Sequence, residues 1–149
     1  MQSGQRMLFN PSSAQVRQFF CDAWKRRQQG LPCEPLQAIA ASWCAEHPEY
    51  VQLLHQPELA LSQAFPPEAG RENPFLHLSM HLALEEQIGA DQPPGIRAAW
   101  QALLHRYQDR HQAAHQAMEC LGRVLWEAQR AQNLPDSELY LECLKRCAG

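Results

Sequence analysis

Apolar residues recur at intervals of three and four along most of this chain, which is the spacing of one face of an α-helix. The first such stripe consists of Val16, Phe19, Phe20, Ala23 and Trp24. Valine and isoleucine are scarce, and no segment shows the alternation of β-branched residues that is typical of strands. The pattern therefore predicts an all-α fold.

Capping residues and helix breakers divide this pattern into separate helices. Ser12 with Gln15 forms a capping-box sequence, Asn73 with Pro74 combines a cap and a first-turn proline, and Asp109 provides a further cap. We expect helices at about residues 13–29, 35–46, 48–64 with a break near 57, 73–89, 96–107, 110–132 and 137–147.

The length and composition indicate one globular domain. A chain of 149 residues can bury one core, and contents of 45% apolar and 19% charged residues are typical of a folded protein. We therefore expect a single-domain helical bundle of six or seven helices over residues 1–149. It would carry an N-terminal tail at 1–11 and a central loop at 66–73.

Charge and hydropathy argue against several classes of partner. The formal net charge is -3, with no block of basic residues, so nucleic acid or an anionic membrane surface is not expected as the main partner. Residues 1–10 contain no apolar stretch long enough for a signal peptide, and no run reaches transmembrane length. We expect a cytoplasmic protein, and a protein partner and the oligomeric state are left open.

The six cysteines show no C-x-x-C motif and no dense spacing. This pattern favours reduced, mostly buried thiols over a disulfide framework. Cys143 and Cys147 lie four residues apart and share a helix face, so they could chelate a metal. Two neighbouring buried thiols are the preferred interpretation of that pair.

Candidate chemistry is concentrated in two copies of the motif H-x-x-x-H-x-x-x-E. One copy runs from His77 through His81 to Glu85, and the other from His111 through His115 to Glu119. A step of four residues turns a helical side chain by only about 40°, so each triple forms one stripe. The apolar residues around each helix place the histidines on its core side.

Imidazole and carboxylate ligands without cysteine suit catalytic zinc or non-haem iron better than structural zinc. We therefore expect a divalent metal, zinc or iron, between the two helices, with ligands from His77, His81, His111, His115, Glu119 and Glu85. An open position on such a metal would activate water or bind an oxygen species. No zincin, nucleophile-elbow or phosphate-binding motif is present, so it stays open whether the protein is an enzyme.

A different interpretation explains the histidines without any metal. A buried imidazole has a donor and an acceptor to satisfy, and leaving them unpaired costs about 1–3 kcal/mol. The histidines and glutamates could therefore form a buried hydrogen-bond network in a non-catalytic interaction or structural module. If His111 is instead exposed in the first helical turn, then His77, His81, His115 and Glu119 still provide four ligands.

A series of short segments resembles a known bacterial family, the domain of unknown function 1841. These segments are Asn73-Pro74-Phe75-Leu76-His77-Leu78, His81-Leu82, Glu86-Gln87, Pro94-Gly95-Ile96-Arg97, His115 and Leu125-Trp126-Glu127-Ala128-Gln129-Arg130. The resemblance covers most of the chain, and it implies a small helical bacterial protein with no established activity. The family pattern includes Glu86 more firmly than Glu85, so either carboxylate can face the predicted site. Residues 125–130 can equally serve as a helix-packing or partner surface.

Overall fold

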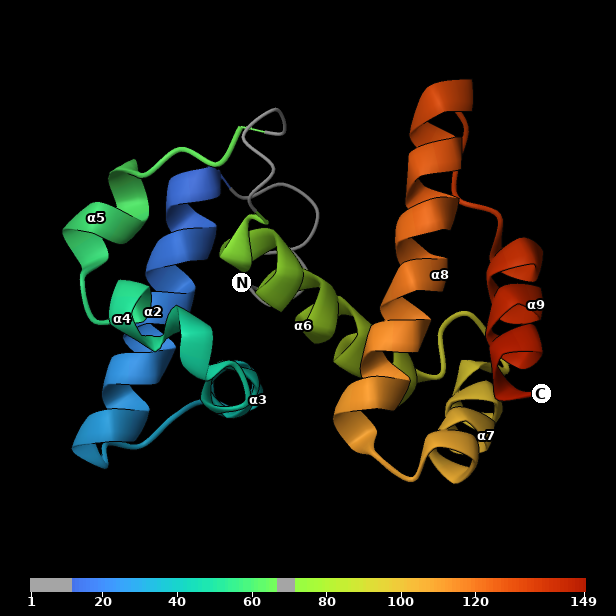
Figure 1. The fold of residues 1–149 in the computed structure, drawn as a ribbon, viewed down its shortest axis with the longest axis horizontal. Helices are drawn as coiled ribbons and strands as arrows, with labels where there is room; N and C mark the ends of the chain where they lie inside the picture. The colour runs from blue at the N-terminus through green and yellow to red at the C-terminus, as the bar shows by residue number, and fades with distance from the viewer. Residues whose placement is uncertain (1–11, 67–71) are drawn as a thin grey trace. The chain divides into compact units, whose positions relative to one another are not determined.

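The computed structural model describes residues 12–66 and 72–149, and these residues form eight α-helices, one 3-10 turn and no strand (Figure 1). The all-α prediction is confirmed. The expected tail at 1–11 lies outside the described residues, as does most of the expected loop at 66–73. The elements are α2 (Ser13–Gln29), α3 (Pro35–Ala45), η1 (Pro48–Tyr50), α4 (Val51–Leu54), α5 (Pro57–Ser62), α6 (Pro74–Ala90), α7 (Ile96–Tyr107), α8 (Arg110–Ala131) and α9 (Ser137–Ala148).

The helix ends follow the predicted caps. Ser12 and Gln15 form the capping box of α2, and Gly30 ends that helix in the left-handed conformation with φ 69°. Asn73 Oδ1 accepts hydrogen bonds from the backbone of Phe75 and Leu76 at the start of α6. The boundaries predicted from caps therefore agree with the structure to within one or two residues.

The described residues form one α-helix more than the seven expected, and prolines account for the difference. The segment predicted at 48–64 consists of η1, α4 and α5, with breaks before Pro48 and Pro57. The two residues that precede these prolines adopt nearly the same non-helical backbone, His47 at φ -124°, ψ 72° and Gln56 at φ -125°, ψ 77°. A proline ring excludes helical geometry from the residue before it, so each proline starts a new short helix.

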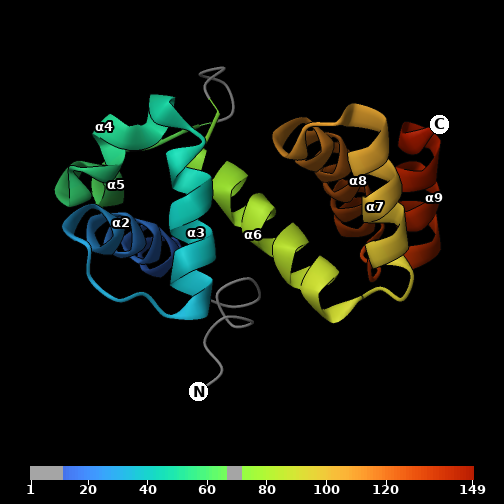
Figure 2. The same cartoon turned by 90° about the horizontal axis from the view of Figure 1, so that it is seen from below.

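The chain divides into two compact units, the first ending at Leu82 and the second running from Ala83 to Gly149. The helix α6 contributes residues to both. In the first unit α2 packs against α3 and against α5 (Figure 2). The core of this unit consists mainly of aromatic and small residues: Phe20, Ala23, Trp24, Ala40, Trp43, Cys44, Leu54, Phe75 and Leu78. The expected single domain over 1–149 stays a prediction.

In the second unit, α7, α8 and α9 each pack against the other two, and they lie side by side in both views (Figures 1 and 2). Ala113, Ala114 and Ala117 of α8 are completely buried. Small side chains let neighbouring helices approach closely, which explains why this stripe of α8 forms a packing face. The rest of this core consists of Leu84, Ile96, Ala99, Trp100, Leu103, Met118, Cys120, Leu121, Val124, Tyr140, Cys143 and Leu144.

Polar contacts anchor the C-terminal end of α6 within the second unit. The Arg97 guanidinium donates to the carbonyl oxygens of Ile88 and Gly89, two of the acceptors that a helix end leaves without an intrahelical donor. Tyr140 of α9 donates from its hydroxyl to Gln87 Oε1 at 2.6 Å. These bonds fix the last turn of α6 relative to α7 and α9.

None of the described helices combines the length and the apolar content that crossing a membrane would need.

The cap of α8 allows a direct stability test. Asp109 Oδ1 accepts hydrogen bonds from the backbone N–H groups of His111 and Gln112. We expect Asp109→Ala to lower the free energy of unfolding by about 1 kcal/mol, because two first-turn donors lose their acceptor. Urea unfolding followed by circular dichroism measures the change. Asp109→Asn keeps an acceptor oxygen and should retain most of the stability, and an equal loss in both variants would contradict the capping role.

Candidate metal-binding site

Helix α6 carries the first predicted histidine pair, and the two side chains differ in burial. His81 is fully buried, whereas the His77 side chain is 14% exposed. The Trp43 ring stacks on the His81 imidazole with a centroid distance of 3.9 Å and an interplanar angle of 22°. This stacking fixes the plane of the His81 ring in the core of the first unit.

A third histidine of the same unit, His47, joins this pair, although it belongs to neither H-x-x-x-H-x-x-x-E motif. In a continuing helix the His47 N–H would donate to the carbonyl of Trp43, but here it donates to Cys44 O at 3.1 Å. The His47 side chain donates to this carbonyl instead, with Nδ1 2.7 Å from Trp43 O, and the backbone N–H of Glu46 also donates to it at 3.1 Å. A carbonyl oxygen can only accept, so Nδ1 carries the proton.

His47 and His77 face each other through their remaining ring nitrogens, with the two Nε2 atoms 3.1 Å apart. On its other side, His77 Nδ1 lies 3.0 Å from Glu72 Oε2. The carboxylate accepts this bond, so Nδ1 of His77 is also protonated. With both rings neutral, each Nε2 therefore directs a lone pair toward the other.

Tyr50 completes a chain of polar contacts that ends at Glu72. Its hydroxyl donates to Glu72 Oε1 at 3.1 Å, and its ring lies nearly parallel to that of His47 at a centroid distance of 5.1 Å. Burial and the neighbouring Glu72 carboxylate raise the pKa of Tyr50, so the phenol keeps its proton at neutral pH. Glu72 therefore acts as acceptor for both His77 and Tyr50.

The three imidazoles of the first unit form a nearly equilateral triangle. Ring centroids are 4.9 Å apart for His47 and His77, 4.9 Å for His47 and His81, and 4.8 Å for His77 and His81. A ring nitrogen of His47 lies within 4.8 Å of one of His81. Each pair of rings meets edge to face, so the three imidazoles share a small volume without stacking on one another.

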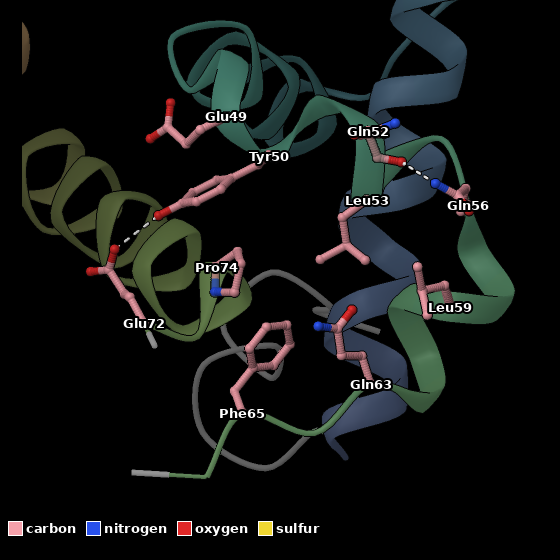
Figure 3. A pocket seen from close by; sticks show the side chains of 10 residues that line it. All are labelled: Glu49, Tyr50, Gln52, Leu53, Gln56, Leu59, Gln63, Phe65, Glu72 and Pro74. Carbon is pink, nitrogen blue, oxygen red and sulfur yellow. Dashed lines mark hydrogen bonds between the residues drawn. The ribbon is translucent and has the colours of Figure 1, made fainter. Parts of the chain in front are cut away.

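A cleft of about 490 Å³ reaches this group of side chains at Tyr50 and Glu72 (Figure 3). Figure 3 shows the Tyr50 hydroxyl directed at the Glu72 carboxylate at one end of the cleft. The remaining lining mixes amide and apolar side chains with one more carboxylate: Glu49, Gln52, Leu53, Gln56, Leu59, Gln63, Phe65 and Pro74. Glu72 therefore lies between the cleft and the imidazole of His77.

The second predicted pair lies in the first two turns of α8. His111 Nε2 and His115 Nε2 are 3.0 Å apart, and both side chains are half-buried. Their ring planes meet at 77° with a centroid distance of 4.3 Å. The spacing of four residues thus brings these two ring nitrogens together, as the motif predicts.

The two predicted carboxylate ligands occupy different surroundings. Glu85 Oε2 accepts from Arg110 at 2.6 Å, so this carboxylate already balances a cation. Glu119 is exposed on α8, and its carboxylate forms no hydrogen bond or ion pair with another described residue. The predicted ligand roles of Glu85 and Glu119, and the single site joining both histidine motifs, stay predictions.

The residues Leu125 and Trp126 expose 43% and 56% of their surface on α8. The Arg130 guanidinium lies over the Trp126 ring, 4.9 Å from its centroid. A role of residues 125–130 as partner surface stays a prediction.

The expectation of reduced cysteines is wrong for one pair, and the interpretation of Cys143 and Cys147 as two neighbouring buried thiols is wrong with it, because Cys143 is oxidised and Cys147 is only half-buried. Cys120 of α8 and Cys143 of α9 form a disulfide within the second unit. This pair cannot be predicted from the sequence because its members are 23 residues apart on separate helices, and only the packing of α8 against α9 brings them together. Elsewhere the expectation agrees with the structure, since burial raises the pKa of Cys21 to about 11 and that of Cys44 to about 12, which keeps both as thiols.

The carboxyl group of Glu86 on α6 allows a test of how desolvating a charge affects stability. Its pKa is raised because the side chain is desolvated, so at neutral pH the ionised carboxylate costs stability in the folded state. This cost disappears when pH falls below the ordinary value near 4.3, where both folded and unfolded chains bind the proton.

We expect Glu86→Gln to raise the melting temperature at pH 7, by an amount that shrinks steadily toward pH 4. Thermal unfolding from pH 4 to pH 8 measures the difference. The exposed Glu127→Gln on α8 removes the same charge without the desolvation and serves as control. A stabilisation by Glu86→Gln that does not change with pH would contradict the role of desolvation.

Comparisons with known proteins identify a family but no characterised relative. A family model described as "Domain of unknown function (DUF1841)" matches residues 12–146, in agreement with the resemblance seen in the sequence. No curated protein and no solved structure matches the chain.

Proposed function

Since this chain belongs to the family described as a domain of unknown function, we propose its function from the site itself: binding of a divalent transition-metal ion by His47 and His77, with His81 as a third ligand. The proposal rests on the side chains of the first unit alone.

The opposed Nε2 atoms of His47 and His77 carry this proposal. Both rings use Nδ1 to donate, one to the Trp43 carbonyl and the other to Glu72, so each ring carries its lone pair on Nε2 when it is neutral. Two lone pairs at 3.1 Å repel each other unless a cation lies between them. A metal ion is one such cation.

The spacing of these nitrogens also agrees with metal ligation. Two imidazole nitrogens on one zinc ion, each at 2.0–2.1 Å with angles between octahedral and tetrahedral, lie about 2.9–3.4 Å apart. The pair formed by His47 and His77 is separated by 3.1 Å, and that formed by His111 and His115 by 3.0 Å. Both separations fall in that range.

The surroundings of the first pair are those that stabilise metal-binding histidines. Such a histidine commonly donates its second N–H to a carboxylate or a backbone carbonyl, which fixes the tautomer and raises ligand basicity. Glu72 provides the carboxylate for His77, and Trp43 provides the carbonyl for His47. Imidazole-rich sites suit zinc or iron, and a coordination position left open would activate water or bind an oxygen species.

A second function is supported by the same contacts. If an extra proton instead of a metal lies between the two Nε2 atoms, then Trp43, His47, His77, Glu72 and Tyr50 form a continuous hydrogen-bond network. The protein would then be a non-catalytic structural or interaction module in which this network joins α3, η1 and α6. The two functions differ in metal uptake.

The first experiment measures metal uptake by protein purified without a histidine tag. We expect wild-type protein, reconstituted with Zn²⁺ or Co²⁺ and desalted, to retain close to one equivalent in the first unit. His47→Ala/His77→Ala should weaken binding by at least about 100-fold, because the two oriented ligands are lost. Elemental analysis gives the stoichiometry, and the visible spectrum of the Co²⁺ form reports nitrogen coordination.

Matched variants separate ligand loss from general damage. His105→Ala removes an exposed imidazole outside both pairs and should bind metal as wild type does. His111→Ala/His115→Ala tests the second pair independently. Wild-type protein that takes up none of zinc, cobalt, iron or manganese would overturn the metal proposal. In that case a lower melting temperature of His77→Ala would favour the network.

The orienting role of Glu72 generates a second test. Glu72→Gln keeps an oxygen that can accept from His77 Nδ1 but loses the negative charge. We expect the affinity for Zn²⁺ to fall about tenfold, since a neutral acceptor makes the imidazole a poorer ligand. Competition with a chromophoric chelator measures the affinity. Glu49→Gln, another carboxylate of the same cleft, should leave it unchanged, and equal affinities in all three proteins would contradict the orienting role.

A further inference from the structure

Three cysteines of the second unit gather where α8 packs against α9. Cys120 and Cys143 form the disulfide, and Cys147 is a free cysteine one helical turn beyond Cys143. Cys147 Sγ lies 3.8 Å from Cys120 Sγ, and the three Sγ atoms all lie within 4.8 Å of one another. Three sulfurs at this spacing are close enough for a thiol and a disulfide to meet.

The three sulfurs differ in their access to solvent. Cys120 is 1% exposed and Cys143 is 7% exposed, so a thiol reagent in solution has little direct access to the disulfide. Cys147 lies near the C-terminal end of α9 and is half-buried. The free thiol is therefore the most accessible of the three sulfurs, and it lies 3.8 Å from the buried sulfur of Cys120.

A metal-binding role for this trio is less well supported than exchange. Only thiolates are good metal ligands, and two of the three sulfurs are already bonded to each other. Thiol–disulfide exchange, by contrast, needs one thiolate next to one disulfide, which is the arrangement present.

We propose that Cys147 is an exchange thiol that connects the buried Cys120–Cys143 disulfide to external dithiols and disulfides. The Cys147 thiolate attacks Cys120 Sγ, a Cys147–Cys120 bond forms, and the Cys120–Cys143 bond breaks. Cys143 leaves as a thiolate and takes a proton from solvent, replacing the proton that Cys147 lost. The number of disulfides is unchanged, so this step needs no oxidant.

Reduction then proceeds at the accessible sulfur. An external dithiol attacks Cys147 Sγ, which releases Cys120 as a thiol and forms a mixed disulfide on Cys147. The second thiol of the reagent closes a cyclic disulfide and releases Cys147. In sum, one protein disulfide and one dithiol give two protein thiols and one cyclic disulfide, and the reverse sequence oxidises the pair.

Two variants test the proposal through disulfide mapping. In Cys143→Ser, incubation with oxidised glutathione should produce a Cys120–Cys147 disulfide and two equivalents of reduced glutathione. Peptide mass mapping after acid quenching and alkylation identifies the bond. Free thiols at both Cys120 and Cys147 in this variant, while wild-type protein forms its disulfide, would overturn the proposal.

The second variant, Cys147→Ser, keeps the disulfide but removes the exchange thiol. We expect dithiothreitol to reduce it at least about tenfold more slowly than wild-type protein under native conditions, with the difference lost in urea. Cys33→Ser removes a free cysteine of the first unit and should react like wild type. Reduction of native Cys147→Ser at the wild-type rate would overturn the proposal. The Cys143→Ser mapping decides the matter independently if Cys147→Ser fails to fold.

Discussion

The hydrogen bond from His47 Nδ1 to the carbonyl oxygen of Trp43 determines how the first unit presents its imidazoles. Pro48 pulls His47 out of helical geometry, so the backbone N–H of His47 no longer reaches that carbonyl. The side chain donates to the carbonyl instead, beside the N–H of Glu46, and the other ring nitrogen, Nε2, faces His77. Without this bond the ring could take the other tautomer, and the opposed lone pairs would be lost.

The two histidine pairs depend on tertiary structure to different degrees. His111 and His115 lie four residues apart on α8, so helix formation alone brings their nitrogens together. His47 and His77 are 30 residues apart and belong to different elements, and their contact requires the end of α3 to pack beside α6. At the pair formed by His47 and His77, the Trp43 carbonyl and the Glu72 carboxylate accept from the two Nδ1 atoms. The metal proposal therefore rests on contacts that only tertiary structure creates.

In the second unit, the packing of α8 against α9 brings together three cysteines that no sequence motif predicts. The completely buried alanines of α8 give that helix a flat packing face in the same unit. Cys120 lies among the buried residues of α8, opposite two cysteines of α9 that are one helical turn apart. Because both α9 cysteines lie near the sulfur of Cys120, this cysteine has two possible disulfide partners instead of one.

The sequence by itself determined the local structure of this protein. Caps such as Ser12 and Asp109 and prolines such as Pro48 act within a few residues, so they locate helix ends without knowledge of the fold. The HxxxH spacing likewise predicts the contact between His111 and His115. Helix type and boundaries depend on near neighbours, and near neighbours are visible in the sequence.

Only the tertiary structure decided which distant side chains meet. The sequence suggests no role for His47 beyond ending a helix, and Glu72 is merely the residue before a cap, yet both orient or join the histidines of α6. The same holds for Cys120 and Cys143, whose spacing matches no motif. Contacts between elements depend on which helix faces bury apolar surface together, and that is a property of the whole core. The sequence therefore predicted two of the three imidazoles in the first unit, and packing supplied the third and its partners.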